Sequence, residues 1–330
     1  MGFTPSHADP SLYILNDPVL GFILVYVDDL IIAAKDDETM AQIKKELMSR
    51  FPMTDMGELT NYLGIEITRN TATKTISLSQ ASYINAILRE YHMEGCSPVQ
   101  TPLPQEHGLT DPAVGNSCES PEEFPRMVGS LMYVMVGTRP DLAYPMSALS
   151  RQLAPGRATQ EHLDQARRVL RYLKGTIDKC LVLGGVTPPV LTGYSDSSWA
   201  DDHTDRRSTQ GYGFTLGSGL ISWRSTRSSA VALSSCEAEL YAATMAAQEA
   251  QWLMYLLEEL GYLLGPAVLK CDNSSVIHLT EEPKFHRNTK HIHLRHFFIR
   301  ELVQQGRIVM QKVPSDCNVA DLFTKALDRK

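Results

Sequence analysis

Cysteine pairs, long apolar runs and a secretory signal are all missing from this chain, and each absence excludes a class of protein. The six cysteines include no Cys-x-x-Cys pair, which excludes a zinc ribbon and argues against a disulfide framework. The most apolar run, residues 21–34, is interrupted by Asp28 and Asp29 and is too short to cross a bilayer. No basic start leads into an apolar core. We therefore expect a soluble intracellular protein.

A strong charge of one sign is missing as well. Lys and Arg number 31 against 38 Asp and Glu, a net charge of −7 that does not by itself indicate a nucleic-acid partner, so local charge must decide. What the chain does have is 330 residues, 43% of them hydrophobic. That is enough for roughly two domains and excludes wholesale disorder.

The order of predicted elements changes near Pro188 and Pro189. Before that point we predict strands at 12–15, 22–27, 30–34, 62–68 and 74–78, helices at 37–51 and 80–91, and helical structure over 124–174, with Asp37 as the first cap. Beyond it we predict strands at 191–198, 211–216, 220–225, 267–271 and 307–313, and helices at 237–260, after 271, at 290–305 and from 319. The second order is that of a mixed α/β fold with a partly parallel sheet.

Four carboxylates occupy positions that an ordinary exposed surface residue does not explain. Asp196 lies inside a predicted strand, where an unpaired buried charge is costly. Asp272 follows the strand at 267–271, and Asp321 begins the last predicted helix. Glu239 lies near the start of the long helix, two residues beyond Glu237, which fits a capping box with Ser234.

Carboxylates that converge in one cleft repel each other unless divalent cations lie between them, and such pairs of cations suit attack on a phosphodiester. Oxygen ligands favour Mg²⁺, with Mn²⁺ as an alternative, over zinc. The other interpretation is structural: Asp272 and Asp321 start helices and Asp196 is exposed. The pattern alone leaves both open.

The same region resembles the ribonuclease H domain of copia-type retrotransposon Pol polyproteins. The resemblance is carried by residues 207–212 (RSTQGY), 214–217 (FTLG), 221–223 (ISW), 231–239 (VALSSCEAE) and 318–325 (NVADLFTK). It implies a ribonuclease H-like fold in which Asp196, Glu239, Asp272 and Asp321 are the catalytic, metal-binding carboxylates. One departure is that residues 312–316 offer no mobile His before the last helix, so product release relies on another group.

Tyr26, Val27, Asp28 and Asp29 resemble the reverse transcriptase active-site hairpin, which presents metal-binding carboxylates on a tight turn. An ordinary Asp-rich turn is the alternative. Residues 57–66 (GELTNYLGIE) and 171–176 (RYLKGT) also resemble the copia-type polymerase and its connecting region, so the resemblance covers essentially the whole chain.

The family places another metal-binding aspartate upstream of this hairpin. Only 25 residues precede Tyr26, and none supplies an apolar strand with such a group. We therefore expect a truncated polymerase half and no DNA synthesis by this chain alone, which a primer-extension assay tests.

Residues 284–312 are basic, with seven Lys or Arg against one acid, Glu301. Cations of this kind set affinity and register along a duplex through phosphate contacts. We predict nucleic-acid contacts, with a solvated helix face as the alternative, from Arg287, Lys290, His291, Arg295 and Arg300.

The sequence thus predicts an α/β protein: an α+β palm and thumb remnant (1–110), a connection region (111–189) and a ribonuclease H-like mixed-sheet domain (190–330). Its predicted function is cleavage of the RNA strand of RNA–DNA hybrids by a metal-dependent endonuclease. The alternatives are RNA-directed DNA polymerase activity when the missing half is supplied, and an inactive nucleic-acid-binding remnant. Expected partners are an RNA–DNA hybrid and the rest of a Pol polyprotein, with no membrane. The expected location is cytoplasmic, with virus-like particles or the nucleus as alternatives.

Overall fold

The structure is a computed structural model that describes residues 2–16, 20–109, 118, 120–154, 157–186, 188–262, 265–281 and 293–328, with backbone alone at 281 and 293–296. Its contacts divide the chain into two compact units. The first comprises Met1–Thr60 and Gln251–Gly265, and the second comprises Asn61–Ala250 and Pro266–Lys330. The first unit has one sheet and the second has two, and each unit has its own buried core.

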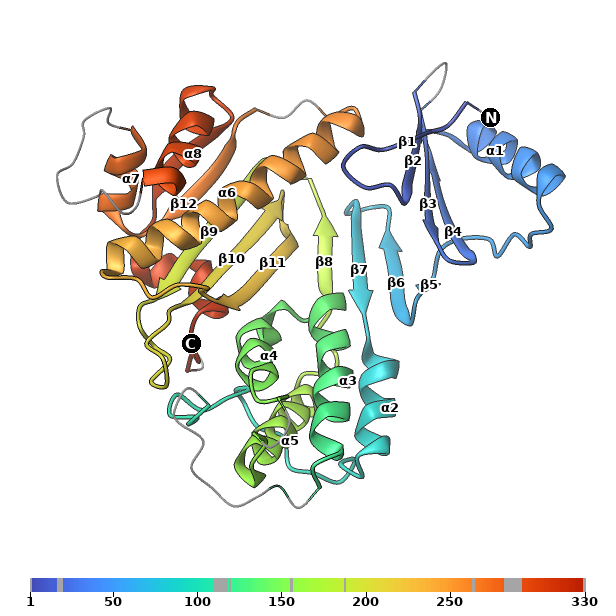
Figure 1. Ribbon diagram of the computed structural model, residues 1–330. Helices are drawn as coiled ribbons and strands as arrows, with labels where there is room; N and C mark the ends of the chain where they lie inside the picture. Colours follow the sequence, from blue (N-terminus) through green and yellow to red (C-terminus); the bar gives the residue numbers. More distant parts are fainter. Residues whose placement is uncertain are drawn as a thin grey trace. The chain divides into compact units, whose positions relative to one another are not determined.

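The first unit is an antiparallel sheet with one helix (Figure 1, blue). Its elements are β1 (Thr4–Pro5), β2 (Leu12–Leu15), β3 (Gly21–Tyr26), β4 (Asp29–Ala34) and α1 (Asp37–Arg50), with the strands paired in chain order. The apolar side chains at helical spacing on α1, Ile43 and Leu47, are buried with Ile23 of β3. This small core is what holds the helix on the sheet.

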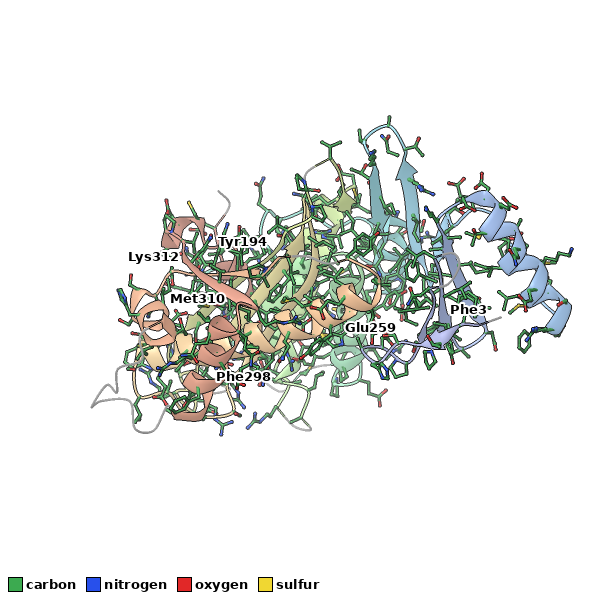
Figure 2. The ribbon with its side chains drawn as sticks, turned by 90° about the horizontal axis from the view of Figure 1, so that it is seen from above. Phe3, Tyr194, Glu259, Phe298, Met310 and Lys312 are labelled. Carbon is green, nitrogen blue, oxygen red and sulfur yellow. The ribbon has the colours of Figure 1, made fainter. Side chains whose placement is uncertain are left out.

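The first unit also includes the end of a long helix, α6 (Ser235–Glu259). The carboxylate of Glu259, labelled in Figure 2, accepts a hydrogen bond from the His7 backbone N–H at 3.0 Å. The indole Nε1 of Trp252 donates to the Ala8 carbonyl at 3.0 Å. These bonds tie residues 251–259 to the turn that precedes β2.

The second unit contains a helical cluster and a short antiparallel sheet. The helices are α2 (Ala81–Glu90), α3 (Glu123–Gly137), η1 (Pro140–Leu142), α4 (Ala143–Ser150) and α5 (Gln160–Gly175). They share a core whose fully buried side chains include Phe124, Met127, Leu131 and Leu149. The strands, paired in this order, are β5 (Asn61–Tyr62), β6 (Ile65–Asn70), β7 (Thr75–Ser79) and β8 (Leu181–Gly184).

The second unit also contains the mixed sheet predicted for the C-terminal region. Its strands, in spatial order, are β11 (Gly219–Arg227), β10 (Thr209–Leu216), β9 (Leu191–Ser198), β12 (Ala267–Cys271) and β13 (Ile308–Lys312). The first three are antiparallel neighbours, whereas β12 runs parallel to both β9 and β13. The remaining elements are α6, α7 (Ser274–Glu281), α8 (His293–Gln304), η2 (Ser315–Cys317) and η3 (Val319–Phe323). Strand β9 is therefore the central strand.

Small side chains let two elements approach this sheet closely. On α6, Ala243, Ala246, Ala247 and Ala250 are fully buried, and Figure 1 shows the helix crossing the sheet. On β10, a Cβ added at Gly211 would lie 2.5 Å from Cβ of Phe323 in η3. The absence of a side chain there is what lets η3 lie against the middle of the sheet.

The mixed α/β fold class is confirmed, and most predicted elements lie within a few residues of the observed ones. Several details are corrected. The cap of α1 is Asp36, whose Oδ1 accepts from the Thr39 N–H at 2.8 Å, and not Asp37. The last predicted helix is the short 3₁₀ segment η3, and the predicted helical stretch over 124–174 is broken into separate helices. Strands β1 and β8 were not predicted. The domain boundaries at 110 and 189 stay predictions.

Candidate metal centre

The central strand β9 carries Asp196, which is 5% exposed. It pairs with Gly211 of β10, and the Thr324 hydroxyl donates a hydrogen bond to its Oδ2. Burial raises the pKa of Asp196 to about 6, and the nearby Asp321 and Asp272 carboxylates add to the rise. The prediction that a central strand buries this carboxylate is confirmed, and the exposed alternative is wrong.

Glu239 lies one turn into α6 and is 8% exposed. Its Oε2 has no hydrogen-bond partner among the described residues, although the Ser197 backbone hydrogen bonds to the carboxylate. Burial raises the pKa of Glu239 to about 9, and Asp196 and Asp272 contribute to that rise. A carboxyl in this position is therefore protonated at neutral pH unless a cation compensates it.

The neighbouring Glu237 has the structural role that its spacing predicts. Its backbone N–H donates to the Ser234 hydroxyl at 3.2 Å, and its Oε2 accepts from the Leu233 N–H at 2.7 Å. The carboxylate thus caps the helix one residue further back than a standard capping box. Glu239 is left to face the sheet.

Asp272 directly follows β12, where the chain turns into α7. The side chain of Asn273 caps that helix by accepting from the Ser275 N–H at 3.0 Å, which frees Asp272 from the capping role. Ligand atoms of Glu239, Cys271 and Asp272 all lie within 4.8 Å of one another. Cys271 was not predicted as part of the site, because only its position before Asp272 in the sequence marks it.

Asp321 lies in η3, and Lys325 Nζ lies 2.8 Å from its Oδ1. The segment is held by Asn318, whose amide donates to the Ser195 carbonyl on β9 at 3.0 Å. Burial opposes the charge on Lys325, but the hydrogen bond to Asp321 and the fields of Asp196 and Asp272 outweigh it and raise its pKa. The sequence motif at 318–325 includes Asn318, Thr324 and Lys325, but its spacing does not predict their individual roles.

The four predicted carboxylates are thus brought to one place from β9, α6, the end of β12 and η3. Asp196 and Asp272 raise the pKa of Glu239, while Asp321 and Asp272 raise that of Asp196. This mutual repulsion and the unpartnered oxygen of Glu239 among the described residues are features that a divalent cation would relieve. An oxygen-rich donor set of this kind fits Mg²⁺ or Mn²⁺.

The predicted polymerase hairpin lies in the first unit, on β3 and β4. Tyr26 pairs with Asp29, so the two-residue turn is Val27 and Asp28, not the expected Asp28 and Asp29. Val27 has φ of 52° and is 81% exposed. Within the described residues, the group of three possible metal ligands, Glu239, Cys271 and Asp272, lies in the second unit. It includes neither Asp28 nor Asp29.

The predicted nucleic-acid contacts lie largely outside the described residues. Arg287, Lys290 and His291 belong to the undescribed part, and Arg295 lies in α8 with its side chain undescribed. Arg300, in α8, is half-buried. No helix in the described parts of the chain has the length and hydropathy that crossing a membrane requires.

Sequence comparison relates the chain to transposon proteins. A family described as reverse transcriptase (RNA-dependent DNA polymerase) matches residues 1–105. The chain is 38% identical to the retrovirus-related Pol polyprotein from transposon TNT 1-94 of Nicotiana tabacum, over 99% of this chain and 25% of that protein. It is 37% identical to the corresponding polyprotein from transposon RE1 of Arabidopsis thaliana, over 100% of this chain and 22% of that protein.

A shorter relative is covered over most of its length. The putative transposon Ty5-1 protein YCL074W of Saccharomyces cerevisiae is 32% identical over 76% of this chain and 80% of its own length. By contrast, the chain spans a quarter or less of the Pol polyproteins that it matches.

Solved structures with similar folds include a foamy viral protease-reverse transcriptase in complex with dsDNA, with a TM-score of 0.47, 15% identity and coverage of 89% of this chain and 55% of that one. They also include LC11-RNase H1 from compost, with a TM-score of 0.34, 14% identity and coverage of 41% and 93%.

Proposed function

Since the chain belongs to the Pol polyprotein family of copia-type retrotransposons, we propose that its C-terminal region is a metal-dependent ribonuclease H-type endonuclease. The substrate would be an RNA–DNA hybrid, of which the RNA strand is cut. The observation that carries the proposal is the convergence of Asp196, Glu239, Asp272 and Asp321, with one buried oxygen of Glu239 lacking a hydrogen-bond partner among the described residues.

These four carboxylates would hold Mg²⁺, with Mn²⁺ as an alternative. When bound, such cations lower the pKa of an attacking water and stabilise the leaving oxygen. The chain's own residues orient the carboxylates: the Thr324 hydroxyl holds Asp196, and the Lys325 ammonium holds Asp321. The positions of the oxygens are thus fixed before substrate arrives, which is the condition for efficient charge stabilisation.

Selection of RNA would come from the 2′-hydroxyl and from the minor-groove shape of the hybrid. We propose that the basic segment over residues 284–312, including Arg287, Lys290, His291, Arg295 and Arg300, contacts the phosphates. Contacts of that kind set affinity and carry no sequence information.

Digestion of a labelled RNA–DNA hybrid, resolved on a gel, tests the proposal, with duplex DNA and duplex RNA as controls. We expect Mg²⁺-dependent cuts in the RNA strand alone. Asp196→Asn and Asp272→Asn should each lower the rate by roughly 100-fold or more. Asp316→Asn, an exposed acid in η2, is the matched control and should keep the rate. Equal activity in all four proteins would refute the site.

A second function is favoured by the hairpin of Tyr26, Asp28 and Asp29, which lies within the residues that match the reverse transcriptase family. We propose that these residues contribute to RNA-directed DNA synthesis when the rest of a Pol polyprotein is supplied. Primer extension with Mg²⁺ by this chain alone would contradict the expectation that it is insufficient.

A further inference from the structure

A buried thiol lies among the proposed metal-binding carboxylates. Cys271, the last residue of β12, is 0% exposed. Its Sγ lies within 4.8 Å of carboxylate oxygens of both Glu239 and Asp272. Mg²⁺ is bound by oxygen ligands, so the proposed Mg²⁺-dependent hydrolysis does not require the Cys271 sulfur.

Two features of the thiol and the neighbouring Glu239 carboxylate favour cation binding. The Asn273 backbone N–H donates to Sγ at 3.4 Å, which holds the sulfur in place. Oε2 of Glu239 is buried without a hydrogen-bond partner among the described residues. The buried Glu239 oxygen and the Cys271 sulfur are therefore two potential metal ligands that lie close together.

The donor set differs from the one that Mg²⁺ prefers. Zn²⁺ and Cd²⁺ bind thiolate together with carboxylate, whereas Mg²⁺ binds oxygen alone. In a tetrahedral Zn²⁺ site with ligands at about 2.1 and 2.3 Å, the ligand atoms are about 3.6 Å apart. Starting from separations within 4.8 Å, side-chain adjustments of at most about 1 Å reach that geometry.

We propose that Glu239, Cys271 and Asp272 form a binding site for a thiophilic divalent cation, Zn²⁺ or Cd²⁺, and that its occupation inhibits the nuclease. On binding, the cation takes the place of the thiol proton, which passes to solvent, and no electron is transferred. The inhibition rests on the proposed function, since Glu239 and Asp272 would otherwise hold Mg²⁺. The binding of Zn²⁺ or Cd²⁺ does not depend on the proposed function.

Titration of the metal-free protein with Cd²⁺, followed by the ultraviolet charge-transfer band of a Cd–thiolate bond, tests the binding. We expect one band that saturates near one equivalent and weakens when excess Mg²⁺ competes for the shared carboxylates. Cys271→Ser should weaken Cd²⁺ binding by roughly tenfold or more and remove the band. Cys180→Ser, at an exposed free cysteine, is the control and should leave both unchanged.

A band that persists in Cys271→Ser, or that disappears in Cys180→Ser, would overturn the site. Inhibition is tested separately, by the ratio of hybrid cleavage with and without Zn²⁺ at fixed Mg²⁺ within each protein. Zn²⁺ should inhibit the parent more strongly than Cys271→Ser, and equal ratios would overturn the regulatory role. If no protein cleaves the hybrid, the proposed function fails while the Cd²⁺ titration still decides the site.

Discussion

Replacing Glu239 by Gln should stabilise the metal-free protein at neutral pH, although it removes a proposed catalytic group. Burial and the Asp196 and Asp272 carboxylates raise the pKa of Glu239 from 4.5 to about 9. Below pH 4.5 the carboxyl is protonated whether the chain is folded or unfolded, so it has no net effect. Between pH 4.5 and 9 only the unfolded state ionises, so the free energy of unfolding falls as the pH rises. At pH 7 the loss is about 3 kcal/mol.

Gln keeps the shape of the neutral carboxyl and does not ionise in the unfolded chain. The Glu239→Gln variant should therefore be more stable than the parent by about 3 kcal/mol at pH 7, and the difference should vanish near pH 4.5. Urea unfolding in the presence of a chelator, followed by circular dichroism at several pH values, measures this. Glu258→Gln, on the exposed face of the same helix, is the control and should change the free energy of unfolding much less at pH 7.

Mg²⁺ provides the complementary measurement. It should stabilise the parent, because it removes the repulsion among the carboxylates, and stabilise Glu239→Gln much less. A stability difference between Glu239→Gln and the parent that stays constant from pH 5 to 8, or a variant less stable than the parent at pH 7, would refute the account of this carboxyl.

Three further substitutions probe how the site is held. Thr324→Val removes the hydroxyl that donates to Asp196 and should cost about 1–3 kcal/mol of unfolding free energy, with the pKa of Asp196 rising further, as NMR titration would detect. Lys325→Met removes a half-exposed cation from Asp321; it should lower metal-free stability by about 1 kcal/mol or less and raise Mg²⁺ affinity, measured by calorimetry, because one positive competitor is gone. Gly211→Ala places a Cβ 2.5 Å from Cβ of Phe323 and should cost about 1–3 kcal/mol. That cost should shrink in a Phe323→Gly background, which removes this Cβ, and an unchanged cost in the double-mutant cycle would contradict the close packing of η3 on β10.

The sequence was most informative where one local pattern dominates. The position of Asp196 inside a predicted strand indicated that it is buried, and the position of Asp272 directly after a strand placed it at the carboxyl end of β12. The capping spacing assigned Glu237 a structural role and so singled out Glu239. Strand, strand-end and capping patterns each span only a few residues, so a short window of sequence is enough to predict them.

The sequence was less informative where distant contacts decide. The turn of the β3–β4 hairpin lies at Val27 and Asp28, because cross-strand register places a β-branched residue at positive φ, against its intrinsic preference. The segment after Asn318 is a short 3₁₀ turn, held by the Ser195 carbonyl and by the space over Gly211. Cys271 joins the carboxylates through the packing of α6 against β12, which no spacing along the chain reveals.

The order in which the chain is synthesised determines when the proposed nuclease site can form. Strands β9, β10 and β11 can pair as hairpins soon after synthesis, since their partners are neighbours in sequence. Asp196, however, meets Thr324 across 128 positions, and Ser195 meets Asn318 across 123. Contacts of such high sequence separation form late in folding. The proposed cleavage activity should therefore appear only after η3 and the residues around it have docked on the sheet.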